Sequence, residues 1–389
     1  MTRFQVNYLN KISPVGTALW TEDYRVSDRL EDAQALVVRS APMQEMSFSE
    51  NLLAVARAGA GVNNIPLDRC AEQGIVVFNT PGANARSVME LTLCGLLLGC
   101  RDVAGGIRWV QSIAGTPDIA KQVEKEKSRF AGHEILGLKL GVIGLGAVGG
   151  PFANAARRLG MEVYGCDPFL SVDAAWHLDS QVRHVNTREE IFAACDVISL
   201  HTPLVEDTKK MINAETLGKM KDGVIILNFA RDLLVDDEAM AQALASGKVR
   251  RYITDFPNEK TAAMPGCIAI PHLGASTQES EDNCAKMAVT QLMNYLENGN
   301  IVNSVNFPNC DMGLCTSEGR ITILHRNIPN SLGRFTTALA GENVNIAGLM
   351  NKSRGAYAYT MLDLDHRPSQ NLVEGLRGIQ GVLRVRVIK

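Results

Sequence analysis

A glycine-rich turn near the middle of the chain constrains the fold more than any other feature. The motif G-x-G-x-x-G follows the apolar run 138–143, precedes a helix-like stretch, and consists of Gly144, Leu145, Gly146, Ala147, Val148 and Gly149. The first glycine permits a tight turn, the second lets the backbone approach a pyrophosphate, and the third lets the helix pack on the strand. The helix N-terminus would face the phosphates. The motif predicts a dinucleotide-binding unit.

Short apolar runs alternate with helix-like stretches on both sides of this turn. The later part of the chain has six strand-like runs, at residues 138–143, 162–166, 197–200, 224–227, 252–253 and 267–270. The earlier part has three, at residues 36–38, 52–55 and 75–78. Strands that alternate with helices form parallel α/β sheets. We therefore expect a Rossmann-type doubly wound domain at residues 87–272, inserted in a smaller flavodoxin-like α/β domain at residues 1–86 and 273–310.

A third unit is expected near the C-terminus. Residues 308–319 are rich in Pro, Asn, Asp, Gly and Ser, which is typical of a linker. The residues that follow alternate between strand-like and helix-like patterns in the order β-α-β-β-α-β. This order predicts a ferredoxin-like domain at residues 319–389, of about seventy residues, close to the lower limit of independent stability.

Composition argues against several classes of protein. With a net charge of −3 and 21% charged residues, the chain lacks the basic footprint that binds nucleic acid. Its nine cysteines are odd in number and show no CxxC spacing, which argues against disulfides and zinc and favours a reducing cytoplasm. The N-terminal residues lack the apolar core of a signal peptide, and the longest apolar run, residues 91–100, is too short to span a bilayer. We expect no metal, no nucleic-acid partner and no membrane segment.

Asp167 distinguishes between the two nicotinamide cofactors. It ends the second predicted strand of the nucleotide domain, 18 residues after Gly149. A carboxylate in this place accepts hydrogen bonds from both ribose hydroxyls and repels a 2′-phosphate. Pro168 and Phe169, which follow, supply no arginine for such a phosphate. We expect NAD rather than NADP, although an aspartate at a strand end is often a simple turn residue.

Three polar residues suit hydride transfer from an alcohol. Arg231, Glu259 and His272 each follow one of the last three predicted strands, at the sheet edge where α/β folds gather their ligands. The planar fork of arginine matches a carboxylate, histidine titrates near neutrality, and a neighbouring carboxylate stabilises its imidazolium. We expect Arg231 to bind the substrate, His272 to be the base and Glu259 to orient it. Taken singly, each residue also fits an ordinary surface or core position.

Segments around these residues resemble signatures of a known family. Residues 227–231 (Leu-Asn-Phe-Ala-Arg) and 271–277 (Pro-His-Leu-Gly-Ala-Ser-Thr) are similar to motifs of the D-isomer-specific 2-hydroxyacid dehydrogenases. Residues 79–84 and 57–64 resemble that family's hinge and substrate loop. The resemblance implies further cofactor contacts by Thr202, Pro203, Ala230, Asp255, His272 and Gly274. It also implies that the carboxylate end of the substrate is held, beside Arg231 and His272, by Ala58, Gly59, Ala60, Gly61 and Asn84.

Within the family, the chain resembles the members that oxidise 3-phospho-D-glycerate to 3-phosphohydroxypyruvate, the first committed step of serine synthesis. The resemblance rests on residues 37–40 (Val-Val-Arg-Ser), on Arg57 and on the C-terminal unit. It implies that Arg39 and Arg57, with Ser40 beside them, bind the substrate phosphate, which the guanidinium fork suits. An arginine at a strand end is otherwise an ordinary surface charge. The alternative is a dehydrogenase for an unphosphorylated D-2-hydroxy acid such as glycerate.

The chain departs from the family pattern in two places. Asp232 stands where the family usually has glycine after the catalytic arginine, which removes a permissive backbone position or adds negative charge near the site. The run 254–259 is one residue shorter than usual between the nicotinamide-contacting aspartate and the catalytic glutamate. Either Asp255 keeps the cofactor role or Thr254 occupies that place, and Glu259 is the acid in both cases.

The C-terminal unit resembles an ACT domain, a module that binds amino acids between paired copies. His325, Asn327 and Asn345 match in type and spacing the residues that hold the effector in serine-inhibited members. Imidazole and amide groups offer donors and acceptors to a zwitterion, although such asparagines also suit helix caps and turns. The resemblance implies L-serine as an effector and a homodimer or homotetramer.

A hypothesis of another class is a non-catalytic scaffold that senses NAD or an amino acid, because fold does not dictate function. The joint presence of Arg231, Glu259 and His272 argues against it, since a sensor has no need of a proton-transfer set. A scaffold would show no turnover with or without His272.

Overall fold

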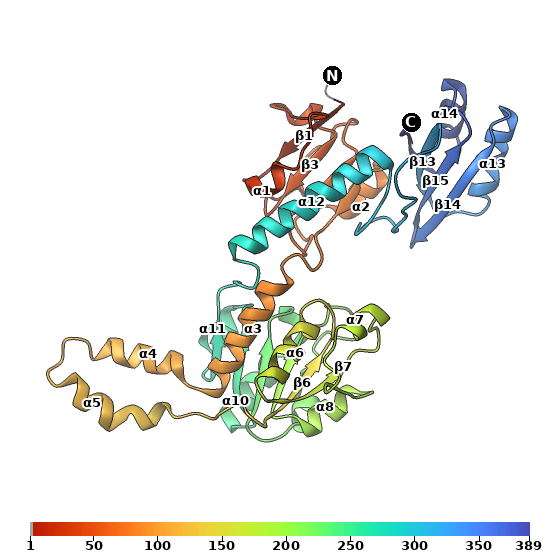
Figure 1. Cartoon of the computed structure of the whole chain (residues 1–389). Coiled ribbons are helices and arrows are strands. Elements are labelled where there is room, and N and C mark those ends of the chain that lie inside the picture. Colours follow the sequence, from red (N-terminus) through yellow and green to blue (C-terminus); the bar gives the residue numbers. More distant parts are fainter. Residues whose placement is uncertain (1–2) are drawn as a thin grey trace. The chain divides into compact units, whose positions relative to one another are not determined.

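A computed structural model describes residues 3–389 of the chain (Figure 1). The chain forms two compact units, one made of the residues up to Asn84 together with Gln278–Lys389, the other of Ala85–Thr277. Within residues 3–389, no helix is both long and apolar enough to cross a membrane. In the same residues, no three His, Cys, Asp or Glu side chains gather as a metal site.

The unit Ala85–Thr277 contains a parallel sheet of seven strands in the order β12-β11-β10-β9-β6-β7-β8. The strands are β6 (Lys139–Ile143), β7 (Glu162–Cys166), β8 (Arg183–His184), β9 (Val197–Leu200), β10 (Val224–Asn228), β11 (Val249–Thr254) and β12 (Cys267–Ala269). The chain starts in the middle of the sheet and builds first toward one edge and then toward the other, which is a doubly wound arrangement. The predicted Rossmann-type sheet is confirmed.

The strands of this sheet are buried on both faces. On β6, Leu140 and Val142 join a core with the helices α3 (Ala85–Cys100) and α6 (Gly149–Arg158). On the opposite face, Ile143 joins a second core with α8 (Arg188–Ala194), α9 (Ala214–Gly218) and α10 (Asp237–Ser246). Parallel strands covered on both faces have continuous apolar sequences, and these runs were therefore recognisable from sequence.

An arm follows α3 that the sequence did not predict. Helix α3 ends at Cys100, and Asp102 starts a new helix because its Oδ1 accepts a hydrogen bond from the Gly105 amide at 3.1 Å. Helix α3 therefore does not continue into the arm. The arm contains α4 (Val103–Ser112) and α5 (Ile119–Glu126), which extend away from the sheet of their own unit (Figure 1).

The other unit contains a parallel sheet of five strands in the order β2-β1-β3-β4-β5. The strands are β1 (Phe4–Tyr8), β2 (Tyr24–Val26), β3 (Ala35–Val38), β4 (Ala54–Arg57) and β5 (Val76–Phe78), with the short helices α1 (Pro14–Thr17) and α2 (Leu67–Glu72) between them. Helix α12 (Gln278–Asn298) covers one face, where Tyr295 packs against Phe78 with ring centroids 5.7 Å apart. This long helix returns the chain to the five-stranded sheet.

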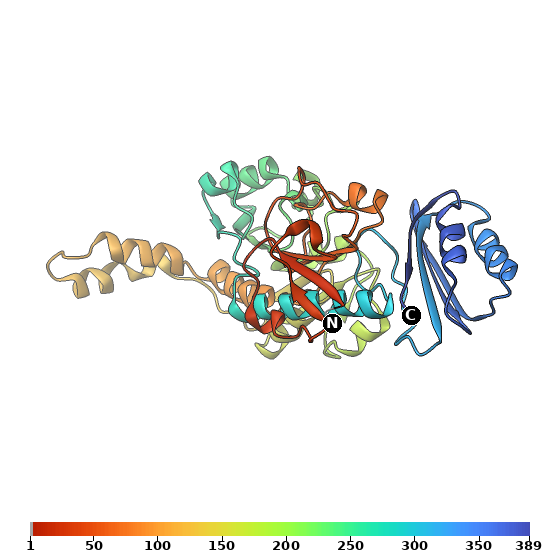
Figure 2. The ribbon, with the colours of Figure 1, turned by 90° about the horizontal axis from the view of Figure 1, so that it is seen from above.

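The C-terminal segment of the same unit forms an antiparallel sheet in the order β14-β15-β13-β16. Its elements are β13 (Gly319–Arg326), α13 (Ser331–Gly341), β14 (Ile346–Arg354), β15 (Tyr357–Leu364), α14 (Gln370–Arg377) and β16 (Val382–Val387), in the expected order. Both helices cover one face of the sheet (Figure 2). From the other face, Leu324, Tyr359 and Met361 join the core that α12 shares with the five-stranded sheet. The two sheets of this unit are therefore packed as one body.

Candidate active site

The glycine turn of the Ala85–Thr277 unit has the shape that a pyrophosphate needs. Gly144 has a φ of 91°, and a Cβ on it would lie 2.6 Å from the carbonyl oxygen of His201. A Cβ on Gly149, the first residue of α6, would lie 1.9 Å from the carbonyl oxygen of Gly144. Gly146 is exposed and has open space where a Cβ would be. Two glycines thus allow close packing, and the third leaves backbone open to a ligand.

Asp167 lies beside this turn at the end of β7. Its Oδ2 accepts a hydrogen bond from the Leu145 amide at 2.8 Å, and its Oδ1 accepts one from the Phe169 amide at 2.9 Å. The carboxylate is partly exposed, and each oxygen retains a lone pair for a ribose hydroxyl. The aspartate and the glycine turn are therefore adjacent in space, and the residues present fit NAD.

Replacing Asp167 with serine is expected to raise the KM for NAD about tenfold, because two charge-assisted hydrogen bonds to the ribose are weakened. The KM for NADP should fall, since the carboxylate no longer repels a 2′-phosphate. Initial rates with both cofactors measure the change, and Asp173→Ser on the exposed surface of α7 (Val172–Trp176) is the control. An unchanged KM for NAD would rule out this role of Asp167.

The loop after β9 also contacts the glycine turn. The Thr202 methyl group lies 3.2 Å from where a Cβ of Gly144 would be, and Pro203 beside it is exposed. His201 hydrogen bonds through Nε2 to Ser199 Oγ at 2.8 Å. Burial lowers the pKa of His201 to about 4, so its imidazole is neutral at physiological pH.

The free energy of unfolding is expected to depend on His201 at acid pH. The unfolded chain binds a proton near pH 6.5 and the folded chain only near pH 4, so the stabilisation is complete above pH 6.5 and is lost as the pH falls toward 4. The loss amounts to about 3 kcal/mol at most. Urea unfolding of the wild type, His201→Gln and the control His184→Gln at pH 7 and 4.5 measures it. Equal acid sensitivity in all three proteins would contradict the prediction.

The buried carboxylate of Asp255 interacts with two of the three predicted catalytic residues. Burial raises its pKa, while the Gly274 amide and the charges of His272 and Arg231 act in the opposite direction. The Gly274 amide donates to Oδ2 at 3.0 Å, whereas the buried Oδ1 has no hydrogen-bond partner within residues 3–389. Arg231 and His272 are both exposed. Asp255 thus lies close to an arginine and a histidine that ligands can reach.

The two candidates for the aspartate position differ in their surroundings. Thr254 is fully buried, and its Oγ1 accepts a hydrogen bond from the Phe256 amide at 3.1 Å. Asp255 has an unsatisfied oxygen, and its neighbour Phe256 contacts the His272 ring with centroids 4.8 Å apart. Of the two residues, Asp255 has the free acceptor that a cofactor amide needs.

Within residues 3–389, Glu259 makes no hydrogen bond or ion pair with His272. It is the exposed first residue of α11 (Glu259–Ala263), and within residues 3–389 its carboxylate makes no hydrogen bond or ion pair. The preceding Asn258 caps the helix and donates through Nδ2 to Asp237 at 2.9 Å and to Asp232 at 3.3 Å. Asp232, the departure next to Arg231, therefore anchors the loop that carries Glu259.

In the other unit, the two predicted phosphate-binding arginines lie at one edge of the five-stranded sheet. Val38 on β3 is paired with Arg57 on β4, and Arg57 Nε donates to the Arg39 carbonyl at 3.1 Å. A Cβ on Gly59 would lie 2.5 Å from Arg57 Nη1, so the guanidinium lies over the substrate loop. Arg39 Nη2 pairs with Glu281 on α12 at 2.7 Å. Two cations and one carboxylate thus meet beside this loop.

Asn10 shapes the loop that carries Arg39, and sequence reasoning did not single it out. Its Oδ1 accepts hydrogen bonds from the amides of Arg39, Ser40 and Ala41 at 2.9, 3.0 and 3.0 Å. Three amides directed at one oxygen restrict this loop. An asparagine shortly after a strand was the available signal, but β1 itself was not predicted.

The substrate loop and the hinge are connected through Asn79. Its Nδ2 donates to the carbonyl oxygen of Ala60 at 2.7 Å. Ala58, Gly59 and Gly61 of the same loop are partly exposed, as is Asn84 at the end of the hinge segment. These residues remain accessible to a small ligand.

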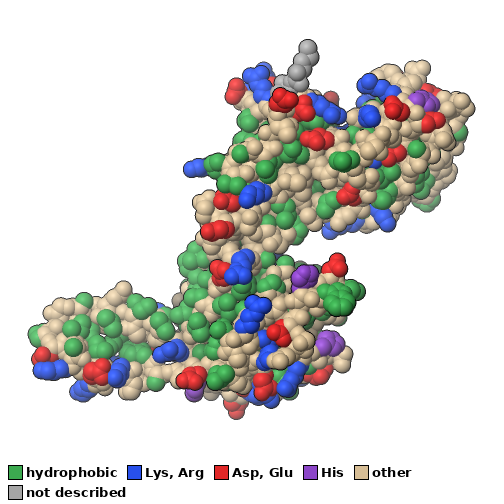
Figure 3. Space-filling model, viewed as in Figure 1, with side chains coloured by type: hydrophobic (Ala, Val, Ile, Leu, Met, Phe, Trp, Pro, Cys, Tyr) green, Lys and Arg blue, Asp and Glu red, His purple; other side chains and the backbone are tan. Residues whose placement is uncertain are grey.

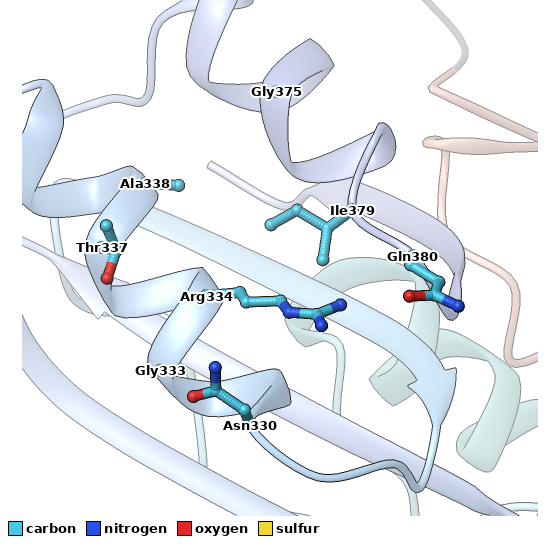
Figure 4. A pocket seen from close by; sticks show the side chains of 8 residues that line it. All are labelled: Asn330, Gly333, Arg334, Thr337, Ala338, Gly375, Ile379 and Gln380. Atoms are coloured by element: carbon cyan, nitrogen blue, oxygen red, sulfur yellow. The ribbon is translucent and has the colours of Figure 1, made fainter.

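The three predicted effector residues do not come together within one copy of the chain. His325 is 3% exposed, and its ring nitrogens contact the Arg326 carbonyl and Thr360 Oγ1, both at 2.9 Å. Asn327 donates to the Gly355 carbonyl at 3.2 Å, beyond the C-terminal end of β14. Asn345 precedes the opposite end of that strand. A separate groove of about 580 Å³ lies between α13 and α14, with Arg334 directed into it (Figure 4).

Comparison with known proteins agrees with this geometry. Residues 100–274 match the family described as "D-isomer specific 2-hydroxyacid dehydrogenase, NAD binding domain". A D-3-phosphoglycerate dehydrogenase of Haemophilus influenzae is 32% identical over 380 residues, which cover 93% of this chain and 88% of that one. The chain belongs to the D-isomer-specific 2-hydroxyacid dehydrogenase family. As a member of that family it is an NAD-dependent dehydrogenase, and the alternative of a non-catalytic scaffold falls away.

Two further relatives show how the family varies. A hydroxypyruvate reductase of Thermotoga maritima is 38% identical over 264 residues, covering 65% of this chain and 81% of that one. The structure of an NAD⁺-bound 3-phosphoglycerate dehydrogenase of Entamoeba histolytica has a TM-score of 0.59 and 26% identity, and covers 78% of this chain and 98% of that one. Members of the family with different names thus share this fold.

Proposed function

We propose that this dehydrogenase oxidises 3-phospho-D-glycerate to 3-phosphohydroxypyruvate with NAD. In this proposal residues 87–272 bind NAD, residues 1–86 and 273–310 bind the substrate, and residues 319–389 are regulatory. The observation that carries it is the pair Arg39 and Arg57 at one sheet edge, joined by the 3.1 Å hydrogen bond from Arg57 Nε to the Arg39 carbonyl. Two guanidinium groups beside exposed backbone suit a phosphate dianion.

Each end of the substrate is assigned to a different set of residues. Arg39, Ser40 and Arg57 bind the phosphate, while Arg231 and the loop from Ala58 to Gly61 hold the carboxylate. NAD supplies the acceptor for the hydride that leaves C2. His272 accepts the hydroxyl proton, which leaves a carbonyl on C2 and an imidazolium on the enzyme. The negative charge of Asp255, which already interacts with His272, stabilises that imidazolium. Glu259 is assigned to orient the His272 ring when the site tightens around the substrate.

The cofactor is held by the glycine turn and by Asp167. The amides near the start of α6 would face the pyrophosphate, and the Asp167 carboxylate would accept hydrogen bonds from the ribose hydroxyls. Thr202, Pro203, Ala230 and Gly274 complete the surroundings of the dinucleotide. Asp255 Oδ1 is the acceptor for the amide of the nicotinamide group.

Initial rates of NADH formation with 3-phospho-D-glycerate and with D-glycerate, at matched concentrations, test the choice of substrate. We expect kcat/KM to be about a hundredfold higher for the phosphorylated acid, since two charge-assisted contacts are added. Equal or reversed preference would leave the dehydrogenase chemistry intact but would exclude phosphoglycerate. The unphosphorylated acid is the second candidate because Arg39 forms an ion pair with Glu281 in the structure and is then not free to bind a phosphate.

We also propose that the C-terminal segment is a ferredoxin-like ACT domain that binds L-serine between paired copies. Asn327 and Asn345 lie at opposite ends of the outer strand β14, so an antiparallel pairing of two such strands would bring one next to the other. Inhibition by L-serine that disappears in Asn345→Ala supports the site. Inhibition that persists in this variant would contradict it.

The arm is the proposed contact between subunits of a homodimer or homotetramer. Ile107 and Val110 on α4 are 53% and 43% exposed, and hydrophobic side chains gather over the arm in Figure 3. Apolar surface of this kind is usually covered by a partner. The molar mass by light scattering should fall to that of a monomer in Ile107→Asp/Val110→Asp, and an unchanged mass would exclude the arm.

All nine cysteines are free, which supports the cytoplasm as location.

A further inference from the structure

A groove outside the proposed active site lies in the unit formed by the N-terminal and C-terminal residues. It has a volume of about 510 Å³, within the range of small-molecule sites. Its lining includes Asn79, Asn303, Ser304, Asn309, Lys352 and Arg354. Among the described residues, no aspartate or glutamate lines it. One wall is the end of β14, and the opposite wall is the segment that follows α12.

The groove carries two positive charges. Lys352 is exposed, and within residues 3–389 its ammonium group makes no ion pair or hydrogen bond. Arg354 Nη1 donates to the Ser304 carbonyl at 2.7 Å, which fixes the side chain and leaves its other donors available. Asn309 Oδ1 accepts the Asn303 amide at 3.0 Å, so the NH₂ group of Asn309 remains a donor. Cations and donors without a nearby acid favour an oxyanion.

A chain of hydrogen bonds connects this groove with the substrate loop. Asn303 Nδ2 donates to Gln291 Oε1 at 2.8 Å, and Gln291 Nε2 donates to the Asn79 carbonyl at 3.0 Å. Asn79 Nδ2 then donates to the Ala60 carbonyl at 2.7 Å. Gln291 is only 8% exposed, so water competes little for its bonds. Asn79 also reaches Asn303 directly, through its amide, at 3.4 Å.

Asn303 is the residue at which a ligand would act on this chain of bonds. Its φ of 61° is a left-handed conformation that non-glycine residues seldom adopt, and the hydrogen bond that its amide donates to Asn309 Oδ1 helps to hold it. A ligand that draws Asn309 or Arg354 toward itself would weaken the hydrogen bonds that hold Asn303 and its neighbour Ser304. The displacement of Asn303 would then reach the backbone of the substrate loop through Gln291 and Asn79.

We propose that the groove binds a small oxyanion of the phosphate class, and that its occupancy changes the mobility of the loop from Ala58 to Gly61. The proposal goes beyond the assigned reaction, because none of the groove residues is placed in the active site by that assignment. It also does not depend on which 2-hydroxy acid is oxidised.

Binding is tested with inorganic phosphate by calorimetry in an Arg39→Ala background, which weakens the proposed substrate-phosphate site. We expect a dissociation constant in roughly the millimolar range, weakened about tenfold by adding Lys352→Ala. Lys219→Ala, an exposed lysine of the other unit, is the matched control and should leave binding unchanged. Equal phosphate affinity in the two double variants overturns the site. Both double variants carry Arg39→Ala, so the difference in their phosphate affinities tests the groove whether or not Arg39 binds substrate.

Coupling is tested by hydrogen exchange of the peptide that contains residues 54–64. In Arg39→Ala, saturating phosphate is expected to change the exchange rate of these amides about threefold or more, and sodium chloride of equal ionic strength is not. In Arg39→Ala/Gln291→Met the change should fall to less than half, while phosphate still binds the groove. Retained binding shows that this variant is folded. An undiminished response in this variant overturns the route through Gln291.

Discussion

Replacing His272 with alanine is expected to lower kcat by about a thousandfold, because a positioned general base contributes roughly 10²–10⁴-fold. The affinity for NAD should change little. His272 is exposed and packs its ring against Phe256, so its removal opens no buried cavity. NADH absorbance at saturating substrate measures turnover, and quenching of tryptophan fluorescence measures cofactor binding.

The control for this variant is His177→Ala, which removes an exposed histidine from the same unit. It should retain the turnover of the wild type. A kcat within tenfold of the wild type would assign the base to another residue.

Sequence located the nucleotide-binding half well because its signals are local. Strands covered on both faces have largely apolar sequences, and β7 and β9 have the predicted bounds. The glycine turn and Asp167 needed only the order of strand, turn and helix around them. By contrast, β1 alternates with the exposed or partly exposed Gln5 and Asn7, and β8 has two exposed residues. Such strands form because neighbouring strands pair with them, and a local sequence pattern contains no information about those neighbours.

The parts of the site that depend on tertiary contacts could not be predicted from the sequence. The pairing of Arg39 with Glu281 joins residues 242 positions apart on different elements. The three amides bound by Asn10 also follow from how two loops meet rather than from any motif. Glu259 shows the converse, because its position after a strand predicted that it orients His272, and within residues 3–389 the two side chains share no hydrogen bond or ion pair. Residue type and spacing predicted which groups gather at a sheet edge, but not which of them touch.

The pairing of Arg39 with Glu281 leads to opposite predictions for its two members. Arg39→Ala is expected to lower kcat/KM for 3-phospho-D-glycerate about a hundredfold, because a guanidinium–phosphate contact is lost. The value for D-glycerate should change less than about threefold, since that acid has no phosphate to lose. Rates with both acids in one buffer give the ratio directly. A similar loss with both acids would mean that Arg39 supports the fold of the loop instead.

Glu281→Gln is expected to raise kcat/KM for the phosphorylated acid about fivefold, and more at low salt, because the carboxylate repels the dianion and competes for Arg39. Glu281 and Arg39 are 38% and 44% exposed, so solvent limits the effect. Glu279→Gln removes a neighbouring exposed carboxylate from α12 and serves as the control. A fall in kcat/KM would instead make Glu281 a positioning residue that orients Arg39. A rise in kcat/KM would mean that Glu281 competes with the substrate for Arg39, and a fall would mean that Glu281 orients Arg39. The distance between the two side chains does not distinguish these roles.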